Sequence, residues 1–390
     1  MFSSRLHWDL RPNRIARALD ERRRAGARVL DLTESNPTRA GIGYPAGLLR
    51  AFEDPGLLAY DPAPAGSRTA REAVSAYYAS RGQRVEPERI LLTASTSEAY
   101  SYLFKLLTDA GDNVLVPRPS YPLFEFLARL ESIEVRQYPL VYHGGWSIDM
   151  DALAAAVSVR TRAVVVVNPN NPTGSYVKRG ELEALARLCA ERGIAILSDE
   201  VFHDYALPPA APDRDRAPAP AGIEDCLAFS MSGLSKIAGL PQMKLGWIVA
   251  SGPTGPCAEA LERLEWIADT YLSVGTPVQC AAPGLLAAGE DVQRQIRERT
   301  SANLAHAREA LAGSAAGILA VEGGWYITVQ APRVRSEEEW VLELLARDVL
   351  VQPGFFYDFE SEAYLVLSLL TPPPVFQEGA ERLRGLADGE

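Results

Sequence analysis

Short apolar runs alternate with helix-like segments through the middle of the chain. Six runs have the length and β-branched content of buried strands: RILLTAS, NVLVP, RAVVVVNP, IAILSDE, CLAFSMS and LGWIVAS. After the first run, apolar and aromatic residues recur at helical spacing, and we expect Gly111 to end that helix. Strands and helices in alternation predict an α/β fold over residues 51–280, with a mostly parallel central sheet covered by helices.

The pattern changes after residue 280. Alternating charges from Glu290 to Leu311 predict a helix that joins two domains. The runs GWYITVQAP and YLVLSLL predict strands flanked by helices, and we expect the N-terminal segment to return to them. These segments predict a smaller α+β domain built from residues 1–50 and 281–390. A Pro- and Ala-rich stretch at residues 208–222 predicts a surface loop of the larger domain.

The composition is that of a globular protein rather than a disordered one. Of 390 residues, 47% are apolar and 23% are charged, and the formal net charge is −11. A protein that binds nucleic acid mainly through its phosphates is not expected at this charge. The first residues are too charged for a signal peptide, and no apolar run reaches the roughly 18 to 20 residues of a membrane span. We therefore expect a cytoplasmic protein with no membrane partner.

The cysteines give no sign of a metal site or of a disulfide framework. They lack CxxC or zinc-finger spacing, and a chain of this length needs no disulfides to fold. We expect reduced core thiols at Cys189, Cys226, Cys257 and Cys280.

Unusual side chains collect directly after four of the predicted strands. Asn171 lies in NPNNPTG, Asp199 closes IAILSD, Lys236 lies in SGLSK, and residues 95–97 are Ser-Thr-Ser at a helix start. In such sheets ligands bind beyond the carboxyl ends of the strands, so these groups are expected to meet. Taken singly, each has an ordinary explanation as a proline turn, a helix cap or a surface lysine.

Together these groups match the needs of pyridoxal 5'-phosphate (PLP). That cofactor requires a lysine for a Schiff base, an acid at its ring nitrogen, a donor to its ring oxygen, a phosphate-binding helix start and a stacked aromatic ring. From DLTESNPT to YLVLSLL, the sequence resembles the class I/II aminotransferases, fold-type I PLP-dependent enzymes of the aspartate aminotransferase superfamily. The most specific motifs are NPNNPTG, LSDE and SGLSK, with 28 residues from Asn171 to Asp199 and 37 from Asp199 to Lys236.

The resemblance implies a role for each of these residues. Lys236 would form the Schiff base and move the α-proton of the substrate, and Asp199 would pair with the ring nitrogen. Asn171 would donate to the ring oxygen and Tyr121 would stack on the ring, although a tyrosine packed in the core is the alternative. Tyr60 would reach the phosphate of the neighbouring subunit, which implies a homodimer with shared active sites. The phosphate would be held by Ser95, Thr96, Ser97, Ser235 and Lys244, the last of which stands where the family usually has an arginine.

Three positions depart from the family pattern. Phe202 stands where a tyrosine usually supports the ring oxygen, so one hydrogen bond to the cofactor would be missing. Gly233 stands where a serine often meets the phosphate, so Ser232 or the backbone would take over. Val366 stands where an arginine usually binds the substrate α-carboxylate, and a neutral side chain cannot make that bidentate contact.

Two explanations of Val366 stay open. In the first, another cation binds the carboxylate: Arg39 in SNPTRAG, beside Ser35 and Asn36 on the expected substrate side, or Arg118 in PRPSYP. In the second, the substrate presents a different group at this position, as an amine or an amide does.

The resemblance implies an aminotransferase that moves an amino group from an amino acid to a 2-oxo acid. Aromatic residues at 324–327 (GWYI) and 353–359 (PGFFYDF) indicate an apolar or aromatic donor, unless they fill the core of the smaller domain. Because of Val366, a PLP-dependent lyase, decarboxylase or cyclising synthase on the same scaffold is the alternative. A DNA-binding sensor is disfavoured by the acidic charge, and a dehydrogenase because no G-x-G-x-x-G follows a strand.

Overall fold

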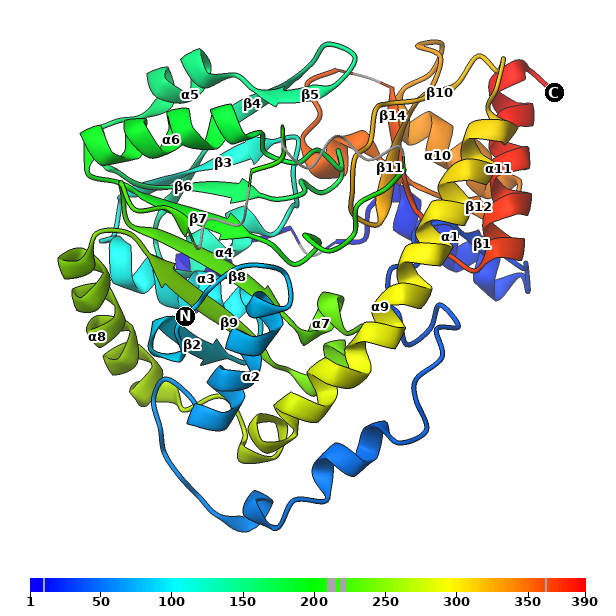
Figure 1. Cartoon of the computed structure of the whole chain (residues 1–390). Helices are drawn as coiled ribbons and strands as arrows, with labels where there is room; N and C mark the ends of the chain where they lie inside the picture. The colour runs from blue at the N-terminus through cyan, green and yellow to red at the C-terminus, as the bar shows by residue number, and fades with distance from the viewer. Residues whose placement is uncertain (10, 209–214, 218–221, 362) are drawn as a thin grey trace.

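The computed structural model describes residues 1–9, 11–208, 215–217, 222–361 and 363–390 (Figure 1). The helices are α1 Arg14–Arg24, α2 Arg68–Ala79, α3 Thr96–Leu107, α4 Phe124–Leu130, α5 Met150–Ala156, α6 Arg179–Arg192, α7 Leu234–Ile237, α8 Thr254–Tyr271, α9 Thr276–Ala310, α10 Glu337–Ala346 and α11 Pro373–Asp388. The strands are β1 Leu30–Asp31, β2 Ile90–Thr93, β3 Asn113–Arg118, β4 Glu134–Tyr142, β5 Trp146–Ile148, β6 Thr161–Val167, β7 Ala195–Asp199, β8 Ala228–Gly233, β9 Gly246–Ser251, β10 Gly317–Ile318, β11 Tyr326–Gln330, β12 Val349–Leu350, β13 Gln352–Pro353 and β14 Tyr364–Ser368.

A large sheet forms the centre of the molecule. Its strand order is β2-β9-β8-β7-β6-β3-β4-β5. The pairs β8–β7, β7–β6, β6–β3 and β3–β4 are parallel, whereas β9 runs antiparallel to both of its neighbours and β5 runs antiparallel to β4. All six strands expected from the sequence lie in this sheet, and the expected α/β fold with a mostly parallel central sheet is confirmed.

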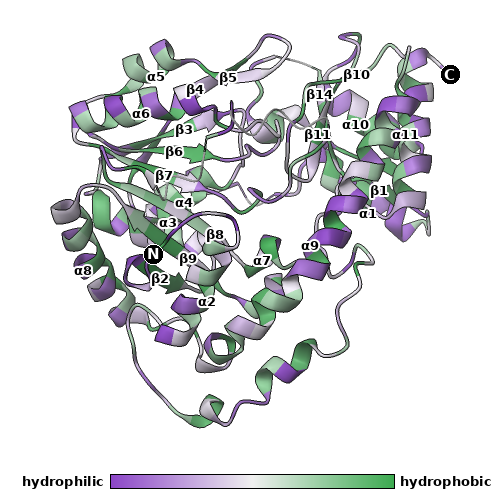
Figure 2. Cartoon of the chain, viewed as in Figure 1, coloured by the Kyte–Doolittle hydropathy of each residue, from purple (hydrophilic) through white to green (hydrophobic). Residues whose placement is uncertain are grey.

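Helices cover both faces of this sheet because its central strands are apolar on both sides. In β6, Val165 packs into the core shared with α3, α4 and α8, while Val164 and Val166 pack into the core shared with α5 and α6. The side chains of successive strand residues point to opposite faces, so a continuous apolar run needs cover on each. Figure 2 shows the matching pattern, with hydrophobic colour on the inner strands and hydrophilic colour along the outer helices.

A second, antiparallel sheet lies apart from the first. Its strand order is β10-β11-β14-β13, and the short parallel pair of β1 and β12 lies beside it. Apolar residues of α1, α10 and α11 pack with β11 and β14 in one core, so the N-terminal segment does return to the C-terminal one. The long helix α9 packs against α2 at one end and against α11 at the other, and so links the two sheets (Figure 1).

Two expectations about elements were wrong, and two strands were missed. The linking helix begins at Thr276 rather than near Glu290, because Pro277 sits in its first turn, where proline is tolerated, and Pro283 is accommodated inside it. Helix α3 ends at Leu107, and Gly111 instead takes a positive φ of 87° in the following turn. Strands β4 and β5 were not expected, because β4 is polar and half-exposed for most of its length.

Most of the Pro- and Ala-rich stretch at residues 208–222 lies outside the described residues. In the part of the chain that the structure describes, no helix is both long enough and apolar enough to cross a membrane. The four cysteines are free thiols, three of them buried and Cys280 half-buried.

Candidate active site

A cavity of about 410 Å³ lies at the carboxyl ends of β6, β7 and β8. Asn171, Asp199 and Lys236 follow or close these three adjacent strands, and all three line the cavity. The opposite wall comes from the second sheet and the turn after it. It is made by Tyr326, Gln352, Phe356 and Tyr357.

Lys236 enters the cavity from the short helix α7. Its amine lies 5.0 Å from the centre of the Trp325 ring and 5.5 Å from that of Phe202. These rings displace water from the amine, and burial lowers the pKa of Lys236 to about 8, against the opposing effect of the Asp199 charge. A substantial fraction of the amine is therefore neutral near physiological pH.

Asp199 closes β7 and is buried under the same cavity. One carboxylate oxygen accepts from the backbone N–H of Val201 at 3.2 Å, and the other accepts from the hydroxyl of Tyr100 at 3.2 Å. Burial raises the pKa of Asp199 to about 6, and these two hydrogen bonds together with the Lys236 charge keep it from rising further. Asp199 is therefore ionised at neutral pH although it is buried.

Asn171 lies in the rigid loop that follows β6. Its neighbour Asn170 ties this loop to the preceding one, since its side-chain amide donates to the carbonyl of Pro119 and to the hydroxyl of Thr173. The Oδ1 atom of Asn171 is buried and has no hydrogen-bond partner in the described part of the chain. Buried polar atoms are nearly always paired, so a group bound in the cavity is expected to complete this site.

The hydroxyl residues expected at the phosphate divide into two groups. Ser95, Thr96 and Ser235 line the cavity. Ser95 also caps α3, with its Oγ accepting from the backbone N–H of Glu98 at 3.2 Å. The free N–H groups of the α3 N-terminus therefore face the same end of the cavity, which favours an anion there.

Three residues expected at the phosphate lie outside the cavity wall in this single chain. Ser97 and Lys244 are solvent-exposed, and Lys244 takes a left-handed conformation with φ of 52°. Tyr60 is 76% exposed and lines a different hollow, of about 220 Å³, together with residues such as Tyr102.

Two departures from the family pattern have a clear structural setting. A side chain at position 233 would meet the backbone of Leu245 and Gly246 at 2.9 Å, so only glycine fits where β8 and β9 approach each other. The Oγ of Ser232 is buried and has no partner among the described residues. Phe202 is buried and packs edge-on against Trp325, with ring centroids 5.2 Å apart.

The expected substrate-side cations lie elsewhere. Arg118 donates to the carbonyl of Asp358 at 3.1 Å and pairs with Glu360 at 3.1 Å. Arg39 is exposed and does not line the cavity. The side-chain oxygen of Asn36 accepts from the backbone N–H of Thr38 and so caps the local turn. Of the residues expected on the substrate side, the cavity wall includes Ser35.

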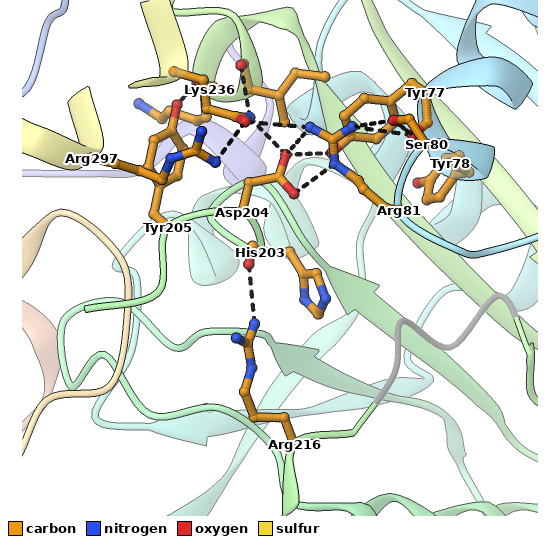
Figure 3. A network of polar contacts seen from close by, with 12 residues as sticks. Tyr77, Tyr78, Ser80, Arg81, His203, Asp204, Tyr205, Arg216, Lys236 and Arg297 are labelled. Atoms are coloured by element: carbon orange, nitrogen blue, oxygen red, sulfur yellow. Dashed lines mark hydrogen bonds and ion pairs between the residues drawn. The ribbon is translucent and has the colours of Figure 1, made fainter. Parts of the chain in front are cut away.

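A buried polar network supports the backbone of Lys236 from behind (Figure 3). The hydroxyl of Tyr205 donates to the Lys236 carbonyl at 2.5 Å, and the amide of Gln293 donates to the Ile237 carbonyl at 3.1 Å. Gln293 also donates to Asp204 at 2.7 Å, and both carboxylate oxygens of Asp204 accept from Arg81 at 2.8 Å. This network fixes the backbone carbonyls of Lys236 and Ile237 and so holds α7 in place.

Sequence reasoning missed several residues that line or support the cavity. Tyr100 stands four residues after Thr96 on α3, and this helical spacing could have placed its hydroxyl on the side of the strand ends. Tyr326, Phe356 and Tyr357 belong to aromatic runs that were noted, but only the fold brings them to the site. The polar network behind Lys236 joins three segments that are far apart in the sequence, so no local sequence pattern predicts it.

Comparisons with known proteins agree with this arrangement. The sequence profile of aminotransferase class I and II matches residues 45–381. The glutamate-pyruvate aminotransferase AlaA of Escherichia coli (strain K12) is 30% identical over 274 residues, which cover 70% of this chain and 66% of that protein, just under two thirds. The protein of the same name from Haemophilus influenzae is 27% identical over 380 residues, which cover 93% of this chain and 92% of that protein. An alanine aminotransferase structure from Pyrococcus furiosus superposes over the full length of both chains, with a TM-score of 0.89 and 23% identity.

The chain belongs to the aminotransferase class I and II family. Enzymes of this family depend on PLP, and the residues of the cavity fit that cofactor. A lysine with a lowered pKa, a buried ionised carboxylate and the side-chain amide of Asn171, whose Nδ2 can donate to a ring oxygen, line one space with a helix N-terminus at its end. When bound, PLP supplies an electron-withdrawing ring that stabilises negative charge at the α-carbon of an amine substrate.

Proposed function

We propose that this chain is a PLP-dependent aminotransferase that moves an amino group from an apolar or aromatic amino acid to a 2-oxo acid. One observation carries the proposal. The amine of Lys236 and the carboxylate of Asp199 open into the same cavity, and they are the only charged groups among the described residues that line it. The aromatic side chains of Tyr326, Phe356 and Tyr357 in the cavity wall support an apolar or aromatic donor.

Lys236 would hold the cofactor covalently and then move a proton at the α-carbon of the substrate. A general base works best with a pKa near the working pH, and burial has lowered the pKa of Lys236 to about 8. Asp199 would keep the proton on the ring nitrogen of the cofactor, and Tyr100 and Val201 hold its carboxylate in one orientation.

The remaining residues would bind and orient the cofactor. Asn171 would donate to the ring oxygen, and Tyr121 would cover one face of the ring. Phe202 packs where it gives the ring oxygen no hydrogen bond. Ser95, Thr96 and Ser235 would bind the phosphate together with the α3 N-terminus, and we keep Ser97 and Lys244 as outer contacts of the same phosphate.

We also propose a homodimer in which Tyr60 reaches the phosphate of the partner's active site. Two neighbouring large side chains are exposed in the single chain, Leu58 at 95% and Tyr60 at 76%. Exposed apolar groups of this kind support a surface that a second subunit covers. A solution mass close to 42.4 kDa, that of one chain, would contradict the dimer. The cytoplasmic location stays a prediction.

The test of the proposed function is the half-reaction itself. Purified protein loaded with PLP is mixed with a panel of L-amino acids, and the cofactor is followed by absorbance and mass spectrometry. We expect at least one donor to convert the cofactor to pyridoxamine 5'-phosphate, and a 2-oxo acid to restore it. The Lys236→Ala variant should slow the conversion by about 10²-fold to 10⁴-fold, the usual contribution of a general base.

Release of ammonia or carbon dioxide from the donor, with the cofactor unchanged, would contradict this proposal. That result would indicate one of the other PLP chemistries.

A further inference from the structure

The cavity needs a place for a carboxylate, because amino acids and 2-oxo acids both carry one next to the reacting carbon. Among the described residues that line the cavity, Lys236 is the only cation, and in the proposed function the cofactor already uses it. Arg118 is bonded to the carbonyl of Asp358 and to Glu360, while Val366 is buried and does not line the cavity. Uncharged side chains are therefore left to bind this group.

Three uncharged donors in the cavity wall have no part in holding the cofactor. They are Ser35 from the segment after β1, Tyr326 at the start of β11 and Gln352 at the start of β13. The hydroxyl groups assigned to the phosphate lie instead at the α3 end of the cavity. All three donors are half-buried, so their polar atoms are open to a bound molecule.

Gln352 offers an N–H group because its acceptor atom is already in use. Its Oε1 accepts from the hydroxyl of Tyr357, and this contact fixes which end of the amide is the nitrogen. Its Nε2 has no hydrogen-bond partner in the part of the chain that the structure describes. A carboxylate can accept from this N–H group, and hydrogen bonds to an ionised acceptor are roughly twice as strong as those between neutral groups.

Tyr326 and Ser35 offer hydroxyl groups from the other side. Burial raises the pKa of Tyr326, and the hydroxyl of Ser35 lies close enough to oppose this increase, so Tyr326 keeps its proton and can donate it. The backbone on both sides of Ser35 is held in place. The carbonyl of Glu34 accepts from Ser368 Oγ at 2.7 Å, and its Oε1 accepts from the N–H of Asn36 at 2.8 Å. Donors fixed in advance lose little freedom when they bind.

These donors face one common space. Burial raises the pKa of Tyr121 to about 12, and the nearby hydroxyl of Tyr326 contributes to the increase. Burial also raises the pKa of Tyr357, with smaller contributions from Tyr326 and Tyr121. Such mutual effects require the hydroxyl groups to lie near one another. Because Gln352 accepts from Tyr357, its amide belongs to the same cluster.

We propose that Ser35, Tyr326 and Gln352 bind the α-carboxylate of the amino donor and of the 2-oxo acid through uncharged hydrogen-bond donors, in place of an arginine. The inference rests on the proposed function, because it names the residues that recognise the substrate in the same cavity. An ionised carboxylate only accepts hydrogen bonds, so it matches a set of donors. A substrate without this group would leave the donors without a partner.

Binding of an unreactive acid tests this assignment. 3-Phenylpropionate carries the carboxylate and an aromatic side chain but no amino group, and 3-phenylpropan-1-ol has a hydroxyl in place of the carboxylate. Calorimetry measures the dissociation constants of both for the PLP-loaded protein. In Tyr326→Phe and in Gln352→Glu, the dissociation constant of the acid should rise at least tenfold relative to that of the alcohol. A smaller change of this ratio in both variants would overturn the inference.

The two substitutions are chosen to preserve the packing of the wall. Tyr326→Phe removes only the hydroxyl. Gln352→Glu keeps an oxygen that accepts from Tyr357 and replaces the N–H donor with a negative charge, so it decides the question if Tyr326→Phe does not fold. Phe356→Leu is the matched control, because Phe356 lines the same wall without a donor. It should change the affinity for the acid and for the alcohol by the same factor.

Turnover separates this inference from the proposed function. L-Phenylalanine is compared with 2-phenylethylamine, which lacks the carboxylate, in the conversion of the cofactor. Both substitutions should lower kcat/KM for L-phenylalanine by at least tenfold relative to 2-phenylethylamine. If L-phenylalanine is converted and this ratio stays unchanged in both variants, the proposed function stands and the inference fails. If no donor converts the cofactor, the proposed function fails and the calorimetry still decides whether these residues bind a carboxylate.

Discussion

Burial controls the protonation of the two charged residues in the cavity. It lowers the pKa of Lys236 to about 8 and raises that of Asp199 to about 6, so near neutral pH a partly neutral amine stands beside an ionised carboxylate. The spacing of the motifs predicted that these residues would meet. It could not predict Tyr100 as a partner of Asp199, because that contact depends on how α3 packs against β7.

The pKa of Lys236 predicts how the protein without cofactor captures PLP. Only the neutral amine attacks the aldehyde, so the capture rate should rise about tenfold between pH 7 and pH 9, for a pKa of about 8, and change little above that. Stopped-flow absorbance across this range measures the rate. Nα-acetyl-lysine amide, with an ordinary lysine pKa, is the control, and its rate should keep rising beyond pH 9. A protein rate that also keeps rising would contradict a lowered pKa.

At the scale of elements, the loop after β6 is positioned by contacts with a distant segment. Gly174 has a φ of 68°, and its carbonyl accepts from the backbone N–H groups of Glu322 at 3.1 Å and Gly323 at 2.9 Å. A Cβ at this position would lie 2.4 Å from Val321 Cγ2 and 2.6 Å from the carbonyl of Gly323. This close approach explains why the loop that carries Asn171 is built with a glycine.

Gly174→Ala should therefore move this loop and weaken PLP binding. The left-handed backbone alone costs about 1–2 kcal/mol for a non-glycine residue, and the steric overlap adds to that cost. Thermal melting and a PLP titration measure the two effects. Gly193→Ala is the control, because Gly193 has a φ of 63° and no atom lies within 4 Å of the place that a Cβ would take, so it should lose stability without losing PLP affinity. Equal effects of the two variants on PLP affinity would contradict the proposed role of the loop.

The elements themselves differed in how well the sequence predicted them. The six strands β2, β3, β6, β7, β8 and β9 are continuous apolar runs, and each was expected from the sequence. The helix was expected to begin near Glu290, where the alternating charges start, whereas α9 begins at Thr276, because the first turn of a helix tolerates proline. Strand β4 was missed because it is polar and half-exposed for most of its length, with Tyr138 its one fully buried residue, so periodicity gives little signal.

At the scale of the whole molecule, the active-site cavity exists only where two sheets meet. The large sheet supplies Asn171, Asp199 and Lys236, and the second sheet with its following turn supplies Tyr326, Gln352 and Tyr357. No local pattern could bring these walls together, because the contact depends on the long helix α9 and on the packing of both chain ends. We propose that the chain has two domains, one on each side of this cavity. The larger domain is residues 51–280, and the smaller one combines residues 1–50 and 281–390.

The most direct measurement of the central claim is the point at which PLP attaches. The loaded protein is reduced with borohydride and digested, and the modified peptide is sequenced by mass spectrometry. We predict a single pyridoxyl group on Lys236 and its loss in the Lys236→Ala variant, which serves as the control. A label on another lysine such as Lys244, or no covalent label on a protein that binds PLP, would contradict the assignment of this cavity as the active site.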